Sequence, residues 1–482
     1  MKDLTKAQGM RVCSWLLPYG VLFATAFALY FKTTGYGFLP SWDDNVYVLD
    51  NAYVRGISLQ NIWGAATTVF AGNYAPLQIL SYAIDFSIWG LEPKGYHLTN
   101  IILHALNACA LYAVVSNISG RKDLAFIASL LFSAFPLNVE NVAWISERKS
   151  LLATFFFLIS IIYYIDFRKK GSLWAHNAAA ISFALAVFSK TSVVILPLLL
   201  AAYEFYYMRD ERKWRPLLPF VYIAAVGAII QVWAHTTDRV IGGDIISPLF
   251  LADTVYPTML PVFWKYVRLV LWPMDLSAYY DAAVYHSFFT PVVFLSLAAL
   301  ILAAVAVFSK GGAQVRFWFI WFWACLLPVS NIIPIPVYFA DRYMYMPAVA
   351  FFVLVASVLT KAAAASGSGM AIKKAGYYVV VSALVFSYAV LTYNRIDVWK
   401  DDLALWSDTV RKSPRQYRVH MNLGFAYEMQ RNFSAAEKEY VVAVALCPFS
   451  KDEPVNKKML ESRLERVRTK MRISKELNIN YQ

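Results

Sequence analysis

The chain has 482 residues, of which 59% are hydrophobic and only 16% are charged. Soluble domains carry about a quarter charged residues, so this composition excludes an ordinary soluble enzyme and indicates a polytopic membrane protein. The formal net charge of +13 does not indicate a nucleic-acid-binding protein, because much of it flanks apolar segments, as expected from membrane topology. We therefore expect a multi-pass protein in a lipid bilayer, without a nucleic-acid partner.

The apolar segments predict an all-α fold, a bundle of about eleven membrane-spanning helices. The first span covers roughly residues 12–30, and a long polar and aromatic loop follows it at residues 32–96. Residues 259–272 are bracketed by prolines and carry two basic side chains, so we expect an interfacial or re-entrant helix there. The remaining spans are expected near residues 97–117, 124–135, 151–165, 173–188, 193–207, 217–234, 291–308, 317–337, 344–359 and 377–393.

Lysine and arginine in the loops set the expected orientation of these spans. The basic loops GRKD, FRKKG, MRDERKWR, SKGGAQVR and KKAG fall on one side if residues 259–272 do not cross. The N-terminus, with Lys2, Lys6 and Arg11, lies on that side and is predicted to be cytoplasmic. The opposite face then holds the first loop and everything after Asn394. It is the periplasm in a bacterial inner membrane, which we expect, or the endoplasmic-reticulum lumen in a eukaryote.

The chain becomes polar at about Asp397, which divides it into a membrane domain, residues 1–396, and a helical domain, residues 397–482, on the outer face. Within this tail, Tyr440 follows Trp406, and Pro448 follows Pro414, by 34 residues. That offset is the period of a tetratricopeptide repeat. One full repeat and a preceding half are too few to be stable alone, so the tail is expected to lean on the membrane domain or a partner.

Charged residues gather in the predicted outer loops. The run SWDDNVYV places Asp43 and Asp44 just after the first span, where carboxylates can act as a general base, a cation ligand or a helix cap. Charges at a membrane boundary are costly unless they pair or bind something, although each could also be an interfacial snorkelling residue. Basic side chains facing an acidic group suggest an anionic lipid-linked ligand, such as a polyprenyl phosphate. The other charged candidates are Glu140, Glu147, Arg148, Lys149, Lys190, Asp341 and Arg342.

The order of several runs resembles a known family. The sequence contains SWDDNVYVLDNAYV, NYAPLQILSYAID, GYHLTN, FPLNVENVAWISERKSLLATFFFL, KYVRLVLWPMDLSAYY and ADRYMYMP, followed by the repeat-like tail. Together they resemble the transmembrane and tetratricopeptide-repeat glycosyltransferases of the GT-C superfamily, whose eukaryotic members are O-mannosyltransferases. The resemblance implies a GT-C membrane fold and transfer of a sugar from a polyprenyl-phosphate carrier to a Ser/Thr-type hydroxyl of a protein acceptor on the outer face.

The resemblance also suggests roles for single residues. An acidic residue in the first outer loop is the key catalytic group of that superfamily and maps to Asp44 or Asp43. In an inverting displacement this carboxylate accepts the acceptor proton, while Glu140 positions the acceptor, replaces the base or holds a divalent cation (Mg²⁺ or Mn²⁺) with Asp44. The expected phosphate-binding cations are Arg342, Lys190, Arg148 and Lys149, and the expected substrate-binding residues are His97, Asp341 and Tyr343. The alternatives are a core role for His97 and an ion pair of Arg342 with Asp341 or Glu140. The tail is expected to hold the protein acceptor.

Two positions depart from the family pattern. Relatives commonly carry histidine where this chain has Ala75 and Phe135. If those histidines bind metal or donor, this chain lacks them. The alternative is therefore a catalytically degenerate membrane scaffold that docks a secreted or membrane protein through its tail. A transporter is disfavoured, because the sequence has no inverted internal repeat and few charges within the spans.

Overall fold

A computed structural model of the chain describes residues 2–237, 251–332, 335, 337–364, 371–447 and 454–476. Within these residues the regular structure is helical, apart from one isolated bridge between Phe70 and Asn73. The predicted all-α class is confirmed for this part of the chain.

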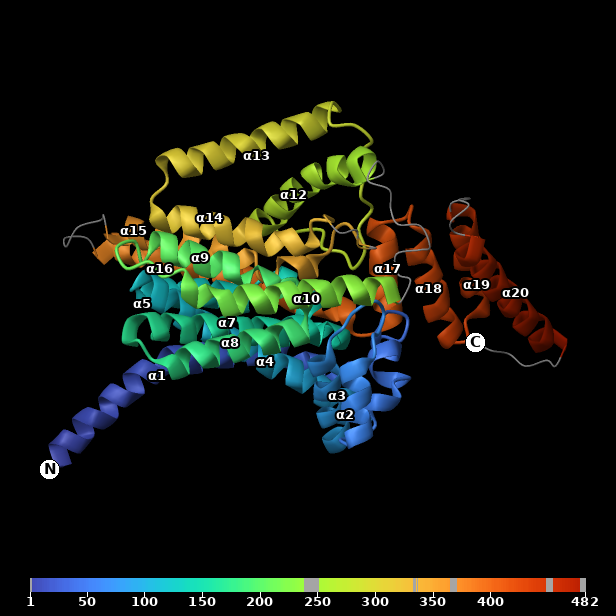
Figure 1. Ribbon diagram of the computed structural model, residues 1–482. Coiled ribbons are helices and arrows are strands. Elements are labelled where there is room, and N and C mark those ends of the chain that lie inside the picture. Colours follow the sequence, from blue (N-terminus) through green and yellow to red (C-terminus); the bar gives the residue numbers. More distant parts are fainter. Residues whose placement is uncertain are drawn as a thin grey trace.

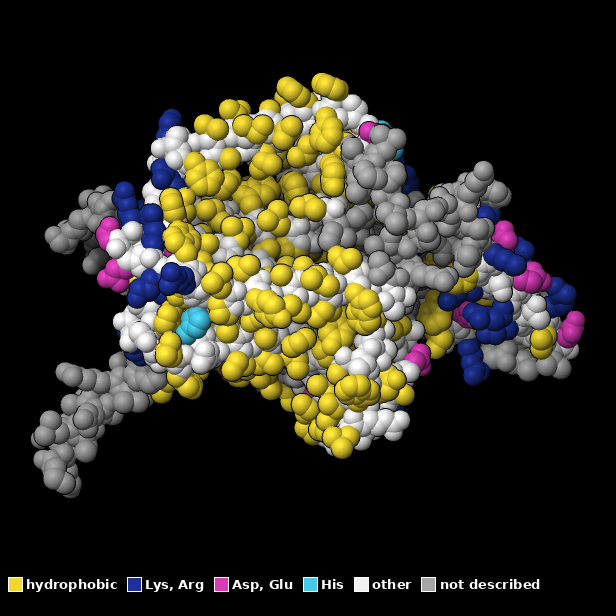
Figure 2. Space-filling view, in the orientation of Figure 1, with side chains coloured by type: hydrophobic (Ala, Val, Ile, Leu, Met, Phe, Trp, Pro, Cys, Tyr) yellow, Lys and Arg dark blue, Asp and Glu magenta, His cyan; other side chains and the backbone are white. Residues whose placement is uncertain are grey.

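Long helices lie side by side in a bundle (Figure 1). Hydrophobic side chains cover the bundle in Figure 2, and charged side chains gather toward its two ends. The bundle contains α1 (Lys2–Tyr30), α4 (Pro93–Ser119), α5 (Lys122–Ser133), α7 (Arg148–Lys170), α8 (Leu173–Ser189), α9 (Leu196–Tyr206), α10 (Leu218–Thr237), α14 (Ala313–Leu326), α15 (Ala348–Ala364) and α16 (Ala371–Ile396).

The described residues include six helices long and apolar enough to cross a membrane, or seven when the bent pair around Ser133 is counted as one span. Four shorter apolar helices accompany them. Each segment predicted to span the membrane contains one of these helices, but the count of about eleven crossings stays a prediction. The predicted interfacial segment forms α12 (Tyr256–Leu271), which packs against α13 (Pro291–Lys310) beside the bundle (Figure 1).

Local sequence explains where several of these helices begin and end. Helix α4 begins with Pro93, whose missing N–H is not needed in the first turn. It ends at Gly120, and α7 ends at Gly171; both glycines are left-handed, with φ of 69° and 70°. A left-handed residue without a Cβ closes the last helical turn at little cost.

The first predicted outer loop is folded rather than irregular. It contains α2 (Leu59–Thr67), α3 (Pro76–Trp89) and the short helical turns η1 (Phe31–Gly35), η2 (Asn45–Leu49) and η3 (Ala52–Val54). Its aromatic and aliphatic residues build a small core of their own, because the loop is long enough to bury them. Figure 1 shows α2 and α3 at the end of the bundle opposite the N-terminus of α1.

The tail forms α17 (Asp402–Lys412), α18 (Tyr417–Met429), α19 (Phe433–Leu446) and α20 (Pro454–Glu476), which follow one another away from the bundle (Figure 1). In α18, Gly424 lies against the ring of Tyr440, where a Cβ would come within 2.9 Å of the ring. This is the close packing of small on large residues that the repeat predicts. Pro448, the other half of the proline match, lies outside the described residues.

The membrane-domain core does not stop at residue 396. Trp399, in the turn η11 (Asp397–Trp399), and Leu405 and Trp406, in α17, are buried in the same hydrophobic core as the bundle. Helices α19 and α20 instead contribute to two smaller clusters. Helix α17 is therefore packed as part of the membrane domain, although its sequence is polar.

Candidate active site

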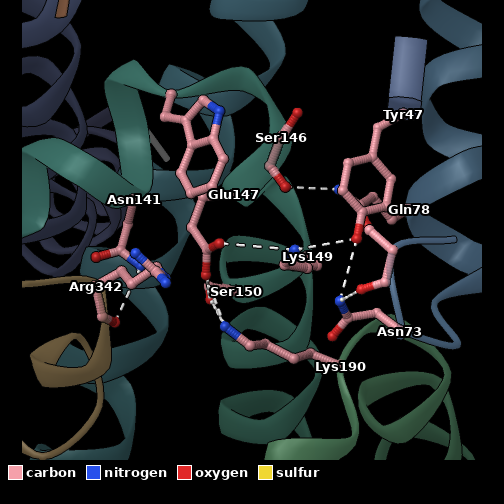
Figure 3. Close-up of polar contacts among 12 residues, drawn as sticks. Tyr47, Asn73, Gln78, Asn141, Ser146, Glu147, Lys149, Ser150, Lys190 and Arg342 are labelled. Atoms are coloured by element: carbon pink, nitrogen blue, oxygen red, sulfur yellow. Dashed lines mark hydrogen bonds and ion pairs between the residues drawn. The ribbon is translucent and has the colours of Figure 1, made fainter. Parts of the chain in front are cut away.

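The predicted site residues meet at the end of the bundle next to α17. The elements that carry them are the first loop, α6 (Val139–Ala143), η5 (Ile145–Glu147), the start of α7 and the turn η10 (Asp341–Met344). Segments separated by about 200 residues face one another here (Figure 3), since Asn141 donates a hydrogen bond to the backbone oxygen of Arg342 at 3.3 Å.

Glu147 lies between two of the predicted cations (Figure 3). Its Oε1 is 2.6 Å from Nζ of Lys190, and its Oε2 is 3.9 Å from Nζ of Lys149. Ser150, one turn along α7, accepts a hydrogen bond from Lys190 at 2.7 Å and donates one to Glu147. The Glu147 carboxylate balances the positive charge of two nearly buried ammonium groups. Without it, the burial of these charges would cost free energy.

Glu140 is occupied by Arg342. Its Oε1 is 2.6 Å from a guanidinium nitrogen of Arg342, and its Oε2 accepts the Arg342 backbone N–H at 2.9 Å. The guanidinium carbon lies 5.7 Å from the ring of Trp144 and 4.9 Å from that of Tyr343. Both oxygens of Glu140 are therefore used to orient Arg342. This arrangement argues against the predicted roles of Glu140 as a base or acceptor-positioning group.

Asp44 is enclosed and saturated with hydrogen bonds. Its Oδ2 accepts the backbone N–H of Leu39 at 2.8 Å, and its Oδ1 accepts the Ser146 backbone N–H at 3.0 Å and the Ser146 hydroxyl. The side chain is fully buried, and burial raises the pKa of Asp44 to about 7. Asp44 thus fastens the first loop to η5, which argues against the predicted catalytic role for this residue.

Asp43 remains as the available carboxylate of the pair. The residue is partly exposed, and in the part of the chain that the structure describes its carboxylate makes no direct hydrogen bond or ion pair. Burial raises the pKa of Asp43, while the charges of Lys149 and Arg342 act in the opposite direction. A carboxylate that faces cations and has free lone pairs can accept a proton from a bound hydroxyl.

Arg148 does not join the cation cluster, although it precedes Lys149 in the chain. Its guanidinium is fully buried and pairs with Asp85 at 2.6 Å. It also donates to the Tyr96 backbone oxygen and to Oδ1 of Asn100, both at 2.8 Å. Arg148 therefore ties α3 and α4 to α7, because neighbouring residues on a helix face different directions. We correct its predicted role from phosphate binding to packing.

Two predicted substrate-binding residues are also used structurally. His97 is buried, with its Nε2 3.4 Å from the Gly37 backbone oxygen. Asp341 accepts a hydrogen bond from the Tyr280 hydroxyl and lies 4.0 Å from Arg395. Neither side chain is among those that line the pocket beside the cation cluster. This argues against the two predicted contacts with substrate, which stay predictions.

A pocket opens beside the cation cluster and has walls of two kinds. Lys190, Arg342 and Tyr343 line one part of it, together with Ser150 and other polar groups. The remaining lining is largely apolar, and it includes Ala153, Val193, Ile195, Cys325, Val329, Met346 and Pro347. This combination suits an amphipathic ligand with an anionic head and a hydrocarbon chain.

The carboxylates do not assemble into a cation site. Asp44 and Glu140, predicted as possible ligands of a divalent cation, are each saturated by their own donors. Among the described residues no group of three or more His, Cys, Asp and Glu side chains is arranged to hold a metal ion. The predicted divalent cation, Mg²⁺ or Mn²⁺, therefore stays a prediction.

The two positions that depart from the family pattern lie in different settings. Phe135 is buried, with its ring 4.8 Å from that of Phe352 and 5.4 Å from that of Tyr388. Ala75 is the residue before the first turn of α3. Phe135 thus fills apolar space between helices, and neither side chain offers a ligand atom.

Two residues of the site, Ser146 and Trp144, were not predicted, and Glu147 was predicted only as one of the charged residues of the outer loops. Glu147 and Ser146 lie in the run NVENVAWISERKS that supplied other candidates, but nothing in the run distinguishes Ser146 as the partner of Asp44. Trp144 carries the cation–π contact with Arg342. These roles depend on contacts with the first loop and η10, which are distant in sequence.

Comparisons with known proteins bear on this geometry. No protein-family model matches the chain. It is 22% identical over 474 residues to protein O-mannosyl-transferase TMTC3 of Homo sapiens, which covers 87% of this chain and 50% of that protein. It is also 22% identical to protein O-mannosyl-transferase F38B6.6 of Caenorhabditis elegans, over 93% of this chain and 64% of that one.

A shorter stretch is more similar. Over 132 residues the chain is 32% identical to protein O-mannosyl-transferase TMTC1 of Homo sapiens, covering 25% of this chain and 15% of the relative. The chain is similar to the TMTC proteins. It spans about half the length of the first TMTC relatives that it matches. The predicted resemblance to membrane glycosyltransferases with a repeat tail is confirmed.

One solved structure was also compared. ArnT from Cupriavidus metallidurans, in a crystal structure with undecaprenyl phosphate, aligns over 90% of this chain and 75% of its own, with a TM-score of 0.44 and 13% sequence identity.

Proposed function

We propose that the chain is a membrane glycosyltransferase that moves a sugar from a polyprenyl-phosphate donor to a Ser/Thr-type hydroxyl of a protein acceptor. The observation that carries this proposal is the pocket that Lys190 and Arg342 line together with apolar side chains. The Asp43 carboxylate, on whose pKa the charges of Lys149 and Arg342 act against burial, is the proposed base. The names of the TMTC relatives support the reaction class. A GT-C arrangement of the membrane helices is part of the proposal.

The proposed reaction is a single displacement. The acceptor oxygen attacks the anomeric carbon, the bond from that carbon to the phosphate oxygen breaks, and the acceptor proton passes to Asp43. The polyprenyl phosphate leaves with the bonding electron pair, and Lys190 and Arg342 stabilise its added negative charge. One displacement inverts the configuration at the anomeric carbon. No metal ion is assigned a step.

The predicted location follows from the charge of the loops. The N-terminus is proposed to be cytoplasmic, and the site and tail are proposed to face the periplasm of a bacterial inner membrane. Helices α2 and α3 of the first loop, and α17, lie at the end of the bundle opposite the N-terminus of α1 (Figure 1), as this arrangement requires. The tail is proposed to hold the protein acceptor.

The test uses the full chain in lipid nanodiscs with undecaprenyl-phosphate mannose or dolichyl-phosphate mannose and a Ser/Thr-rich peptide. Mannose is the first sugar to try because of the names of the relatives. Asp43→Asn is expected to lower kcat at least about a hundredfold while donor binding changes little. Asp50→Asn, an exposed aspartate of the same loop, is the matched control. Full turnover by Asp43→Asn would refute the base assignment.

The alternative function is a degenerate scaffold, and the absence of ligand atoms at Ala75 and Phe135 favours it. It predicts that the intact chain neither transfers nor hydrolyses either mannose donor, yet binds a secreted or membrane protein through its tail. Donor hydrolysis by the intact chain, lost in Asp43→Asn, would exclude the scaffold.

A further inference from the structure

The loop that carries Asp43 is in contact with a helix far along the chain. Asp402, at the start of α17, accepts two hydrogen bonds from Ser41: one from the backbone N–H at 3.3 Å and one from the hydroxyl. The indole N–H of Trp406, one turn later, donates to the same hydroxyl oxygen at 2.6 Å. All polar groups of the Ser41 side chain and its N–H are thus engaged by α17.

Aromatic packing continues this contact toward the cation cluster. The ring of Trp42 meets that of Trp406 edge-on, with centroids 5.1 Å apart, and lies 5.5 Å from that of Trp144. The ring of Trp144 in turn makes a cation–π contact with the guanidinium of Arg342. A column of side chains therefore runs from α17, past the residue before Asp43, to a proposed phosphate-binding cation.

Further polar contacts fasten the same two segments. Asp397 pairs with Lys32 at 2.9 Å and accepts the Tyr36 hydroxyl at 2.6 Å. On the other side of α17, Arg395 pairs with Asp408 at 2.7 Å and lies 4.0 Å from Asp341, the neighbour of Arg342. Helix α17 is thus bonded both to the first loop and, through Arg395, to η10.

Asp43 lies between two fixed points of the chain. Asp44 is held by Leu39 and Ser146, and Ser41 is held by Asp402 and Trp406. With both flanks held, few backbone conformations remain for Asp43, so its carboxylate stays directed toward the cations. Removal of the Ser41 contact would leave only one fixed flank.

We propose that α17 is a part of the active-site scaffold, in which Asp402 and Trp406 act as positioning residues for Asp43. This rests on the proposed function for the role of Asp43. The geometry itself does not depend on that role. Neither side chain is expected to touch substrate; each acts through Ser41 or Trp42.

The test compares two conservative tryptophan variants. Trp406→Phe keeps an aromatic ring and loses the hydrogen bond to Ser41. Trp399→Phe is the matched control, because Trp399 is also fully buried, stacks 6.1 Å from Trp144, and has an indole N–H without a hydrogen-bond partner among the described residues. Thermal melting in detergent establishes that both variants are folded.

Trp406→Phe is expected to speed hydrogen exchange of the backbone amides at residues 39–45, measured by mass spectrometry, and to lower kcat about tenfold or more with undecaprenyl-phosphate mannose. Small displacements of a catalytic group have effects of this size. The KM for the donor should change less than about twofold, because the phosphate cations are not on the loop. Trp399→Phe should match the wild type in all three.

Two further variants check that the hydrogen bonds act as one unit. Ser41→Ala combined with Trp406→Phe should lower kcat little more than either change alone, because both remove the same contact. Asp402→Asn, which retains an oxygen acceptor, should exceed Asp402→Ala in kcat. If Trp406→Phe does not fold, Ser41→Ala alone and the two Asp402 variants carry the test through the same exchange and kcat measurements.

The outcomes separate this inference from the proposed function. Equal exchange and equal kcat in Trp406→Phe and Trp399→Phe would overturn the positioning role. If the wild type transfers no sugar from either mannose donor, the proposed function fails, and hydrogen exchange alone tests the positioning role. Faster exchange in Trp406→Phe but not in Trp399→Phe supports that role. Unchanged exchange in Trp406→Phe overturns it.

Discussion

Two adjacent aspartates of the first loop differ in their hydrogen bonds and in their exposure. Asp44 has three hydrogen-bond donors around it and no exposed surface. Asp43 is partly exposed and faces Lys149 and Arg342. A similar division separates Arg148, paired with Asp85, from Lys149, which faces Glu147. Residue type and position along the chain are nearly the same within each pair, so the surroundings decide the role.

The buried carboxyl of Asp44 leads to a prediction about pH and stability. Burial raises its pKa to about 7 in the folded protein, from an ordinary value of 3.8. The folded state then binds a proton that the unfolded state has lost, so this group's contribution to stability falls as pH rises from about 4 to about 7. Asp44→Asn removes the titration and places an amide group among hydrogen-bond donors.

We therefore expect the free energy of unfolding of Asp44→Asn to be lower than that of the wild type at pH 5, by about 1–3 kcal/mol. The reason is that the amide N–H₂ of the new side chain would face a hydrogen-bond donor. The difference should shrink at pH 8. Melting temperatures of both proteins in detergent at the two pH values provide the measurement. The other buried carboxyl groups titrate in both proteins, so their contributions cancel when the stability of the variant is subtracted from that of the wild type. A gap that widens with rising pH would show that the donors favour the ionised form instead.

At the scale of elements, α17 belongs to the membrane domain in its packing and to the tail in its sequence. Its polar composition suggested a boundary at residue 397, yet Leu405 and Trp406 are in the bundle core. Further contacts tie its C-terminal end to the segment after α12, since Lys412 donates to the Leu276 backbone oxygen and Ser413 to that of Tyr279, both at 2.7 Å. Helices α19 and α20 have separate clusters.

Two truncations should therefore behave differently. A chain that ends at Ile396 should lose transfer to a short peptide as well as donor hydrolysis, because the Asp43 loop loses Asp402 and Trp406. A chain that ends at Cys447, without α20, should retain peptide transfer within about threefold, since α17 and its contacts remain. Kinetics on both truncations in nanodiscs check this. Peptide transfer by the shorter chain at the wild-type rate would contradict the account.

At the scale of the whole molecule, the ends of the bundle are unlike each other. The N-terminus of α1 lies at one end, and the first loop, the candidate site and the tail lie at the other (Figure 1). Hydrophobic side chains cover the part between them (Figure 2). A bilayer around that apolar part would separate the two ends, as the basic loops predict.

Labelling of single cysteines tests this separation. In a chain whose native cysteines are replaced by serine, Glu461→Cys in α20 and Lys170→Cys at the end of α7 mark exposed positions at opposite predicted faces. In intact bacterial spheroplasts an impermeant maleimide should label position 461 and leave position 170 unlabelled until the membrane is opened. Labelling of both positions in intact spheroplasts would contradict the predicted orientation.

The sequence by itself determined the class of protein, the helical bundle and the set of charged segments from which the site is built. These follow from composition, apolar segment length and local motifs, which are properties of neighbouring residues. Lys149, Lys190 and Arg342 were predicted together for that reason, and the structure brings them to one site.

Only the tertiary structure decided that Asp44 and Arg148 are enclosed by hydrogen-bond and ion-pair partners. Their neighbours differ, since Asp43 is partly exposed and Lys149 lies in the cation cluster. The tertiary structure also decided that α17 contacts the loop that holds Asp43. Ser146 meets Asp44 from 102 residues away, and Trp406 meets Ser41 from 365 residues away. No local pattern encodes such contacts, because they arise when the whole bundle packs and each buried polar group must find a partner. The same packing places a polar helix of the tail in the membrane-domain core.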